Sequence, residues 1–135
     1  MLRAMKRVLI MTAGVLLLAG CGAAGGREDA AAAVASGLLT AVAGRDGAAA
    51  CASLAPRTRA ELEKSAGTSC PEAILDEHLP APGRVISAAV FGQQAQVRLA
   101  DDTIFLGVFP GGWRVLAAGC KPRGDQPYDC TLQGS

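Results

Sequence analysis

Histidine, closely spaced cysteines and a basic surplus are all scarce or missing in this sequence. His78 is the single histidine, and none of the five cysteines lies in a C-x-x-C pair. Because structural zinc sites use closely spaced Cys and His ligands, we expect no metal site. The 13 basic and 12 acidic residues nearly balance, which argues against the basic surface that nucleic-acid binding requires. No catalytic motif stands out, so we expect neither an enzyme nor a bound cofactor.

The chain also lacks an apolar run long enough to cross a membrane. Residues 8–19 form an uncharged, mostly apolar run of about a dozen residues, where a spanning helix needs about 20. Three basic residues, Arg3, Lys6 and Arg7, precede it. This pattern is typical of an export signal peptide, here residues 1–20. The alternative, a permanent transmembrane anchor, is disfavoured by the length of the run.

The signal ends in Leu18-Ala19-Gly20-Cys21, which resembles the lipobox of bacterial lipoproteins. The resemblance implies that the Cys21 thiol receives a diacylglycerol and that the signal is cut between Gly20 and Cys21. It also implies a mature protein held on the outer face of the bacterial cytoplasmic membrane, since two acyl chains anchor a protein stably. We expect residues 21–29 to comprise the lipidated cysteine and a flexible tether.

The mature chain would contain 115 of the 135 residues, enough for one domain, which we place at residues 30–135. Cleavage removes three of the 13 basic residues and none of the 12 acidic ones, which leaves a formal charge of −2. Such a near-neutral surface argues against strong electrostatic docking on anionic lipid.

Four further cysteines, Cys51, Cys70, Cys120 and Cys130, predict two disulfides in an exported chain. Three pairings are possible. We favour Cys51–Cys70 and Cys120–Cys130, because each pair brackets one local segment. The second disulfide would pin the C-terminal tail to the last strand.

Hydrophobic periodicity predicts helices in the first half of the domain and strands in the second. The expected helices span residues 30–43, 48–54, 57–65 and 69–79, and the last begins with the capping box Ser69-x-x-Glu72. The expected strands span residues 85–91, 94–99, 103–109 and 113–118, and the tail from residue 121 is loop-rich with a candidate edge strand at 128–132. The predicted class is α+β, with helices packed on a curved antiparallel meander of about four strands.

Three segments carry a second resemblance: the helix Ser69-Cys-Pro-Glu-Ala-Ile-Leu75, the strand Gly111-Gly-Trp-Arg-Val115, and the ending Cys120 to Cys130. In this order they resemble small actinobacterial lipoproteins with the cone-shaped nuclear transport factor 2-like fold. Many members of that fold carry a hairpin between the second and third helices. Residues 57–68 show no strand pattern, so we expect an abbreviated cone with a small cavity.

An isomerase of that fold would need a carboxylate base and a hydrogen-bond donor inside the cone. Asp101 and Asp102 fall in a predicted hairpin turn, where Asp is common, and Tyr128 falls inside the segment closed by the predicted Cys120–Cys130 disulfide. We therefore assign no catalytic residue. Candidates for the core or for lining a pocket are Trp113, Phe105 and Phe91.

The strand at 103–109 is apolar on both faces, so one face needs cover from the tail or from a partner. Because sheet-face pairing is common in the resembled fold, a homodimer is one hypothesis. We expect a non-enzymatic envelope lipoprotein that binds a small apolar ligand or a protein partner. The alternatives are an accessory subunit that docks on another envelope protein through its sheet face, and an isomerase-like enzyme.

Overall fold

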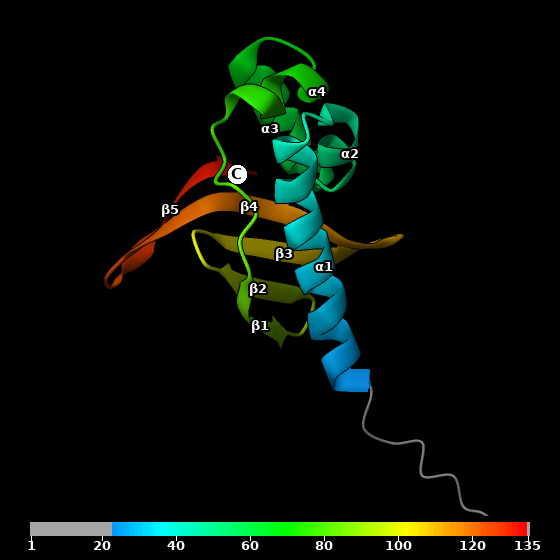
Figure 1. Cartoon of the computed structure of the whole chain (residues 1–135), viewed down its shortest axis with the longest axis vertical. Helices are drawn as coiled ribbons and strands as arrows, with labels where there is room; N and C mark the ends of the chain where they lie inside the picture. The colour runs from blue at the N-terminus through cyan, green and yellow to red at the C-terminus, as the bar shows by residue number, and fades with distance from the viewer. Residues whose placement is uncertain (1–22, 135) are drawn as a thin grey trace, which may run out of the picture.

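The helices come first in the chain and five strands follow them (Figure 1). The computed structural model describes residues 23–134, so Cys21 and the predicted signal peptide lie outside the described part. The helical elements are α1 (Ala23–Ala43), α2 (Gly47–Ala52), α3 (Pro56–Ala66), α4 (Cys70–Ala73) and the 3-10 turn η1 (Ile74–Asp76). The strands are β1 (Val85–Phe91), β2 (Gln94–Leu99), β3 (Thr103–Phe109), β4 (Gly112–Arg123) and β5 (Gln126–Gln133). The predicted α+β class is confirmed.

Helix α1 begins seven residues earlier than the sequence pattern predicts. The expected flexible tether at residues 22–29 is wrong from Ala23 onward, because that stretch is already helical. The segment has no proline to break a helix, and the Arg27 guanidinium donates a hydrogen bond to the Gly92 carbonyl at 2.6 Å. This contact ties the first turns of α1 to the sheet.

The next two helices lie close to their predicted places. Asp46 caps α2, since its carboxylate accepts a hydrogen bond from the Ala49 N–H at 3.0 Å. Pro56 stands in the first turn of α3, where its missing N–H costs nothing. Gly67 ends α3 in a left-handed conformation.

The predicted helix at 69–79 is wrong in both its cap and its length. The Ser69 side chain makes no capping hydrogen bond, and Glu72 instead accepts one from the Thr68 hydroxyl at 2.6 Å. The Glu63 carboxylate of α3 accepts a hydrogen bond from the Cys70 N–H at 3.1 Å, so a neighbouring helix satisfies one of the free N–H groups at the start of α4. Helical structure ends with η1, and His78 lies beyond it with a positive φ of 54°.

The sheet has five strands in the order β1-β2-β3-β4-β5, and each neighbouring pair is antiparallel. The candidate edge strand at 128–132 is confirmed as part of β5, whereas the loop-rich tail is wrong and the sheet has five strands rather than about four. Strand β4 runs on to Arg123, and the tail returns as β5 with Cys120 directly opposite Cys130. Gly124, with a φ of 63°, makes the turn between them.

One face of the sheet packs on the helices and forms the core. Helix α1 runs across the strands from β1 towards β4 (Figure 1). The side chains of Leu38 and Leu39 on α1 and Ile74 on η1 are buried. They meet a set of alternating buried strand residues: Ala95, Val97, Leu99, Ile104, Leu106, Trp113, Val115 and Leu132. The space between helices and sheet is filled by these side chains.

Candidate functional site

Both predicted disulfides are present. Cys51 is bonded to Cys70, which joins α2 to α4, and Cys120 is bonded to Cys130 across the β4–β5 pair. Four of the five cysteines are therefore paired, and the fifth, Cys21, lies outside the described residues. Of the helices in the described part of the chain, none combines the length and apolarity needed to span a bilayer.

The sheet face opposite the core carries a second layer of side chains, which we call the open sheet face: Ala89, Gln96, Phe105, Phe109, Leu116 and Tyr128. Strand pairing sets Ala89 beside Gln96 and Gln96 beside Phe105, so these three share a face. The Tyr128 ring meets that of Phe105 edge-on, with centroids 5.1 Å apart, and Gln96 donates a hydrogen bond to the Tyr128 hydroxyl at 3.2 Å. All six side chains are half-buried, although the helices pack on the other face. The layer combines aromatic and aliphatic surface.

The three aromatic candidates end in three different environments. Trp113 is 9 % exposed and belongs to the core, with the Arg27 guanidinium 5.5 Å from the centre of its ring. Phe105 belongs to the open sheet face. Phe91 is 68 % exposed at the end of β1, so its prediction as a core or pocket residue is wrong. It is the last residue before the β1–β2 turn, and β1 has only one neighbouring strand.

An open groove of about 520 Å³ lies at the β2–β3 turn. Its polar wall includes Arg98, Asp101, Asp102 and Lys121, and Tyr128 also lines it. A smaller cavity of about 130 Å³ shares Asp101, Asp102 and Lys121 and extends to His78. The groove and the smaller cavity therefore meet at the β2–β3 turn, which carries Asp101 and Asp102.

Asp102 is the group that sequence reasoning missed. Its side chain is 7 % exposed, and its two carboxylate oxygens accept hydrogen bonds from the backbone N–H groups of Gly119 at 3.0 Å and Cys120 at 2.9 Å. Burial raises the pKa of Asp102 above its usual value, and the hydrogen bonds from backbone N–H groups oppose the rise. The assignment of Asp102 as an ordinary turn residue is wrong. Its partners lie 17 and 18 residues away, and no local signal in the sequence indicates them.

The bonds of Asp102 define what this carboxylate does in the fold. Each oxygen already holds a backbone N–H, so the group fastens the β2–β3 turn to β4. A general base must reach the proton that it removes, and both oxygens of Asp102 are already held by backbone N–H groups of β4. Within residues 23–134, no group of three or more His, Cys, Asp or Glu side chains is placed to hold a metal ion.

A third groove, of about 470 Å³, lies between the helices and the β3–β4 turn. Its apolar wall is formed by Leu54, Pro56, Phe109 and Pro110. Arg114 also lines it and donates a hydrogen bond to the Ala52 carbonyl. This groove adjoins the open sheet face through Phe109.

In comparisons with protein-family models, curated proteins and solved structures, nothing matches the chain. The resemblances to lipoproteins and to the nuclear transport factor 2-like cone therefore stay predictions. The function has to be argued from the geometry of the chain itself.

Proposed function

We propose that this chain is a lipid-anchored, non-enzymatic protein of the bacterial envelope that binds a protein partner through its open sheet face. The partner would be a second copy of the chain or another envelope protein. The nuclear transport factor 2-like cone, in abbreviated form, is the finer fold assignment that we propose with it.

The pairing of the cysteines supports the export and anchoring part of this proposal. Disulfides form and persist in oxidising compartments outside the cytoplasm. Both pairs join residues on facing elements, so they fit the fold without rearrangement. The two disulfides use the other four cysteines, and Cys21 stands at the end of an apolar run with the length of a signal peptide, where lipidation is proposed.

The open sheet face carries the binding part of the proposal. Phe105, Phe109, Leu116 and Tyr128 come from the three neighbouring strands β3, β4 and β5, and they form one half-buried apolar layer. The opposite face already fills the core. A sheet with apolar residues on both faces is typical of a sheet that is covered on both sides. A partner that covers this layer would complete its burial.

Site-specific photo-crosslinking in living cells tests this part. A photoreactive phenylalanine analogue at position 105 or 109 should give a discrete adduct, at twice the protein mass for a second copy or at another fixed mass for an envelope protein. The same analogue at Lys64, which is exposed on α3, is the matched control and should give none. Equal labelling at the three positions, or no adduct, would contradict the proposal.

A small apolar ligand is the second candidate, because the groove beside Phe109 and Pro110 has an apolar wall of suitable size. Native mass spectrometry of the exported, non-reduced protein distinguishes the two candidates. A co-purified small adduct that Phe109→Asp removes would favour the ligand. A protein that carries no adduct would favour the sheet-face partner.

A further inference from the structure

Strand β1 is an edge strand with an unusually apolar exposed surface. Its sequence, Val-Ile-Ser-Ala-Ala-Val-Phe, contains no charged residue, and it pairs only with β2. Val85, Ile86 and Phe91 are 39 %, 49 % and 68 % exposed, and they are three of the four large apolar side chains that the described part of the chain exposes most. Proteins protect such edges with charges, proline or a covering element, because a bare edge invites aggregation. An exposed apolar edge of this kind needs a cover.

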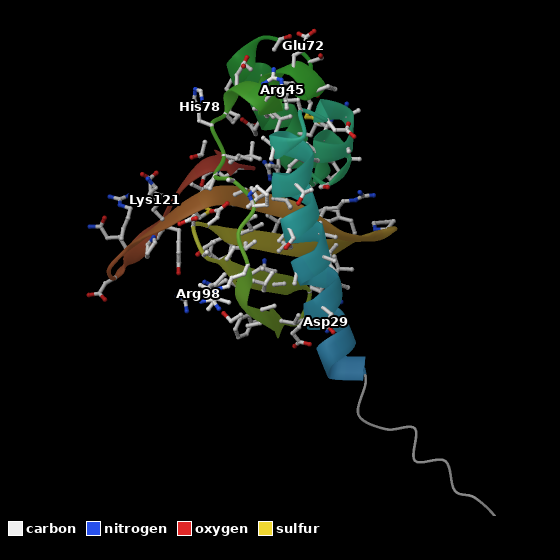
Figure 2. The ribbon with its side chains drawn as sticks, in the orientation of Figure 1. Asp29, Arg45, Glu72, His78, Arg98 and Lys121 are labelled. Atoms are coloured by element: carbon white, nitrogen blue, oxygen red, sulfur yellow. A yellow bond between two sulfur atoms is a disulfide. The ribbon has the colours of Figure 1, made fainter. Side chains whose placement is uncertain are left out.

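The place of β1 in the molecule indicates what that cover is. Helix α1 reaches the sheet at β1, and the Arg27 guanidinium donates a hydrogen bond to the carbonyl of Gly92, the residue after Phe91. Figure 2 shows Asp29 and Arg98 at the end of the molecule that holds β1, whereas Arg45, Glu72 and His78 lie at the opposite end. The strand therefore lies beside the first turns of α1.

The proposed lipid anchor is close to the same place. Cys21 precedes Ala23 by two residues, which can span at most about 7 Å even when fully extended. From Ala23 to Arg27 the helix rises by about 6 Å. The acylated cysteine is therefore within about 13 Å of the Arg27 turn along the helix, an upper bound that is about twice the thickness of one headgroup layer, roughly 5–8 Å. A lipid at Cys21 would hold the bilayer surface close to β1.

We propose that β1 is the membrane-contacting edge of this protein, with Phe91, Ile86 and Val85 seated in the headgroup and acyl boundary of the bilayer that holds the Cys21 lipid. This inference rests on the proposed anchoring at Cys21. The occupant is a lipid surface, and the apolar side chains supply the attraction.

The charges around β1 fit a neutral interface better than a strongly anionic one. Exposed Arg27, Arg84 and Arg98 lie on or next to the elements that border the strand, and Glu28 and Asp29 follow Arg27 on α1. Opposite charges thus nearly balance at this edge. The contact should therefore persist in vesicles without anionic lipid and at raised salt.

The test uses the full lipidated protein in phosphatidylcholine vesicles, with Phe91→Trp as the reporter. The wild type, whose single tryptophan Trp113 is buried, supplies the background emission. Lys64→Trp, on exposed α3 away from β1, is the matched control. With brominated phosphatidylcholine in the bilayer, quenching of the added emission should be about threefold or more stronger for the Phe91→Trp protein than for the Lys64→Trp protein.

Each other outcome overturns the inference in a distinct way. If the protein floats with the vesicles but both reporters are quenched equally, the anchor stands and the β1 contact is wrong. If the Phe91→Trp reporter is shielded from aqueous iodide but insensitive to brominated lipid, a second copy or another protein covers the edge. If mass spectrometry finds no lipid at Cys21, the proposed anchoring and the β1 contact are both wrong.

Discussion

The Asp102 carboxylate accepts a hydrogen bond from the backbone N–H of Gly119 at 3.0 Å, and Gly119 has a left-handed φ of 65°. The pairing of β3 with β4 shifts register at this point, between Thr103 and Phe105. Gly119, with its positive φ, lies on β4 at this register shift, where the β3–β4 hydrogen-bond ladder is interrupted. The Asp102 carboxylate accepts hydrogen bonds from the two backbone N–H groups at this place, those of Gly119 and Cys120. The neighbouring Cys120 then continues to its disulfide with Cys130.

Gly119→Ala should therefore be strongly destabilising. A Cβ at this position would lie 2.8 Å from the Thr131 side chain and 3.1 Å from Leu79, in addition to the cost of the left-handed backbone. We expect a loss of about 3 kcal/mol or more in the free energy of unfolding. Urea denaturation of the non-reduced protein, followed by the fluorescence of buried Trp113, measures it.

Gly124→Ala separates the cost of the left-handed backbone from the cost of the steric clash. Gly124 has nearly the same φ as Gly119, 63°, but nothing lies within 4 Å of its added Cβ. The backbone cost alone should be about 1 kcal/mol. Equal losses for the two variants would mean that the packing of Thr131 and Leu79 around Gly119 does not matter.

The buried carboxylate of Asp102 predicts a pH dependence of stability. Its pKa is raised in the folded protein by burial, so the folded chain holds this proton more tightly than the unfolded chain. Stability contributed by the protonated form is present below the unfolded pKa of about 3.8 and is lost as the pH rises through the folded pKa. Unfolding free energies measured from pH 3 to pH 7 should therefore contain a component that falls with pH.

Asp102→Asn identifies that component, since the amide does not titrate. The variant leaves one backbone N–H of β4 facing another donor, which costs about 1–3 kcal/mol. The stability difference between wild type and variant should shrink as the pH rises above about 4. A difference that grows with pH would show that the two backbone hydrogen bonds outweigh burial.

The strands and the disulfides are the part of this fold that the sequence predicts best. Alternation in β2, with Ala95, Val97 and Leu99 facing inward, marks a half-buried strand directly. Apolar residues at helical spacing around Leu38 likewise predict the buried side of α1. Local spacing was also enough for the Cys51–Cys70 and Cys120–Cys130 pairs, because each closes a short segment.

The parts that sequence reasoning missed depend on contacts between distant residues. In the tail the sequence predicts only a candidate edge strand at 128–132, because exposed Pro127 weakens the strand pattern before it; pairing with β4 extends that strand to Gln126–Gln133. Ser69 matches a capping box, but its side chain makes no capping hydrogen bond; Glu72 accepts from the Thr68 hydroxyl instead, and Glu63 of α3 accepts from the Cys70 N–H. Asp102 looks like a turn residue until β4 brings Gly119 to it. Each case is a tertiary contact that overrides a local preference.

Removal of either disulfide should destabilise the protein by a similar amount. The pairs close segments with separations of 19 and 10 residues, and the chain-entropy relation assigns about 3 kcal/mol to each loop, slightly more to the longer one. The double variants Cys51→Ala/Cys70→Ala and Cys120→Ala/Cys130→Ala test this in urea. Since Cys120 and Cys130 already pair in the sheet, a loss below about 1 kcal/mol for that variant would indicate that the reduced hairpin stays closed in the unfolded chain.

The two candidate helix caps should respond differently to alanine. Asp46→Ala removes the hydrogen bond to the Ala49 N–H and should cost about 1 kcal/mol. Ser69→Ala, the matched control, removes no side-chain capping bond and should change stability by less than about 0.5 kcal/mol. Thermal or urea unfolding of the two variants measures both losses of stability. A larger loss for Ser69→Ala than for Asp46→Ala would mean that Ser69 does cap α4, as the sequence predicts.

Gly47 of α2 lies directly against the backbone of α4. A Cβ on Gly47 would stand 2.0 Å from the carbonyl oxygen of Pro71, next to the Cys51–Cys70 disulfide that joins the two helices. Because backbone rather than a flexible side chain blocks the space, Gly47→Ala should cost about 3 kcal/mol.

Gly37→Ala is the control for that change. Gly37 lies inside α1 with nothing within 4 Å of its added Cβ, so alanine there should stabilise the protein by about 0.5–1 kcal/mol. Urea denaturation should therefore move the two variants in opposite directions from the wild type. If Gly47→Ala unfolds at the wild-type urea concentration, α2 and α4 do not approach as closely as Gly47 and Pro71 indicate, and the disulfide alone holds them together.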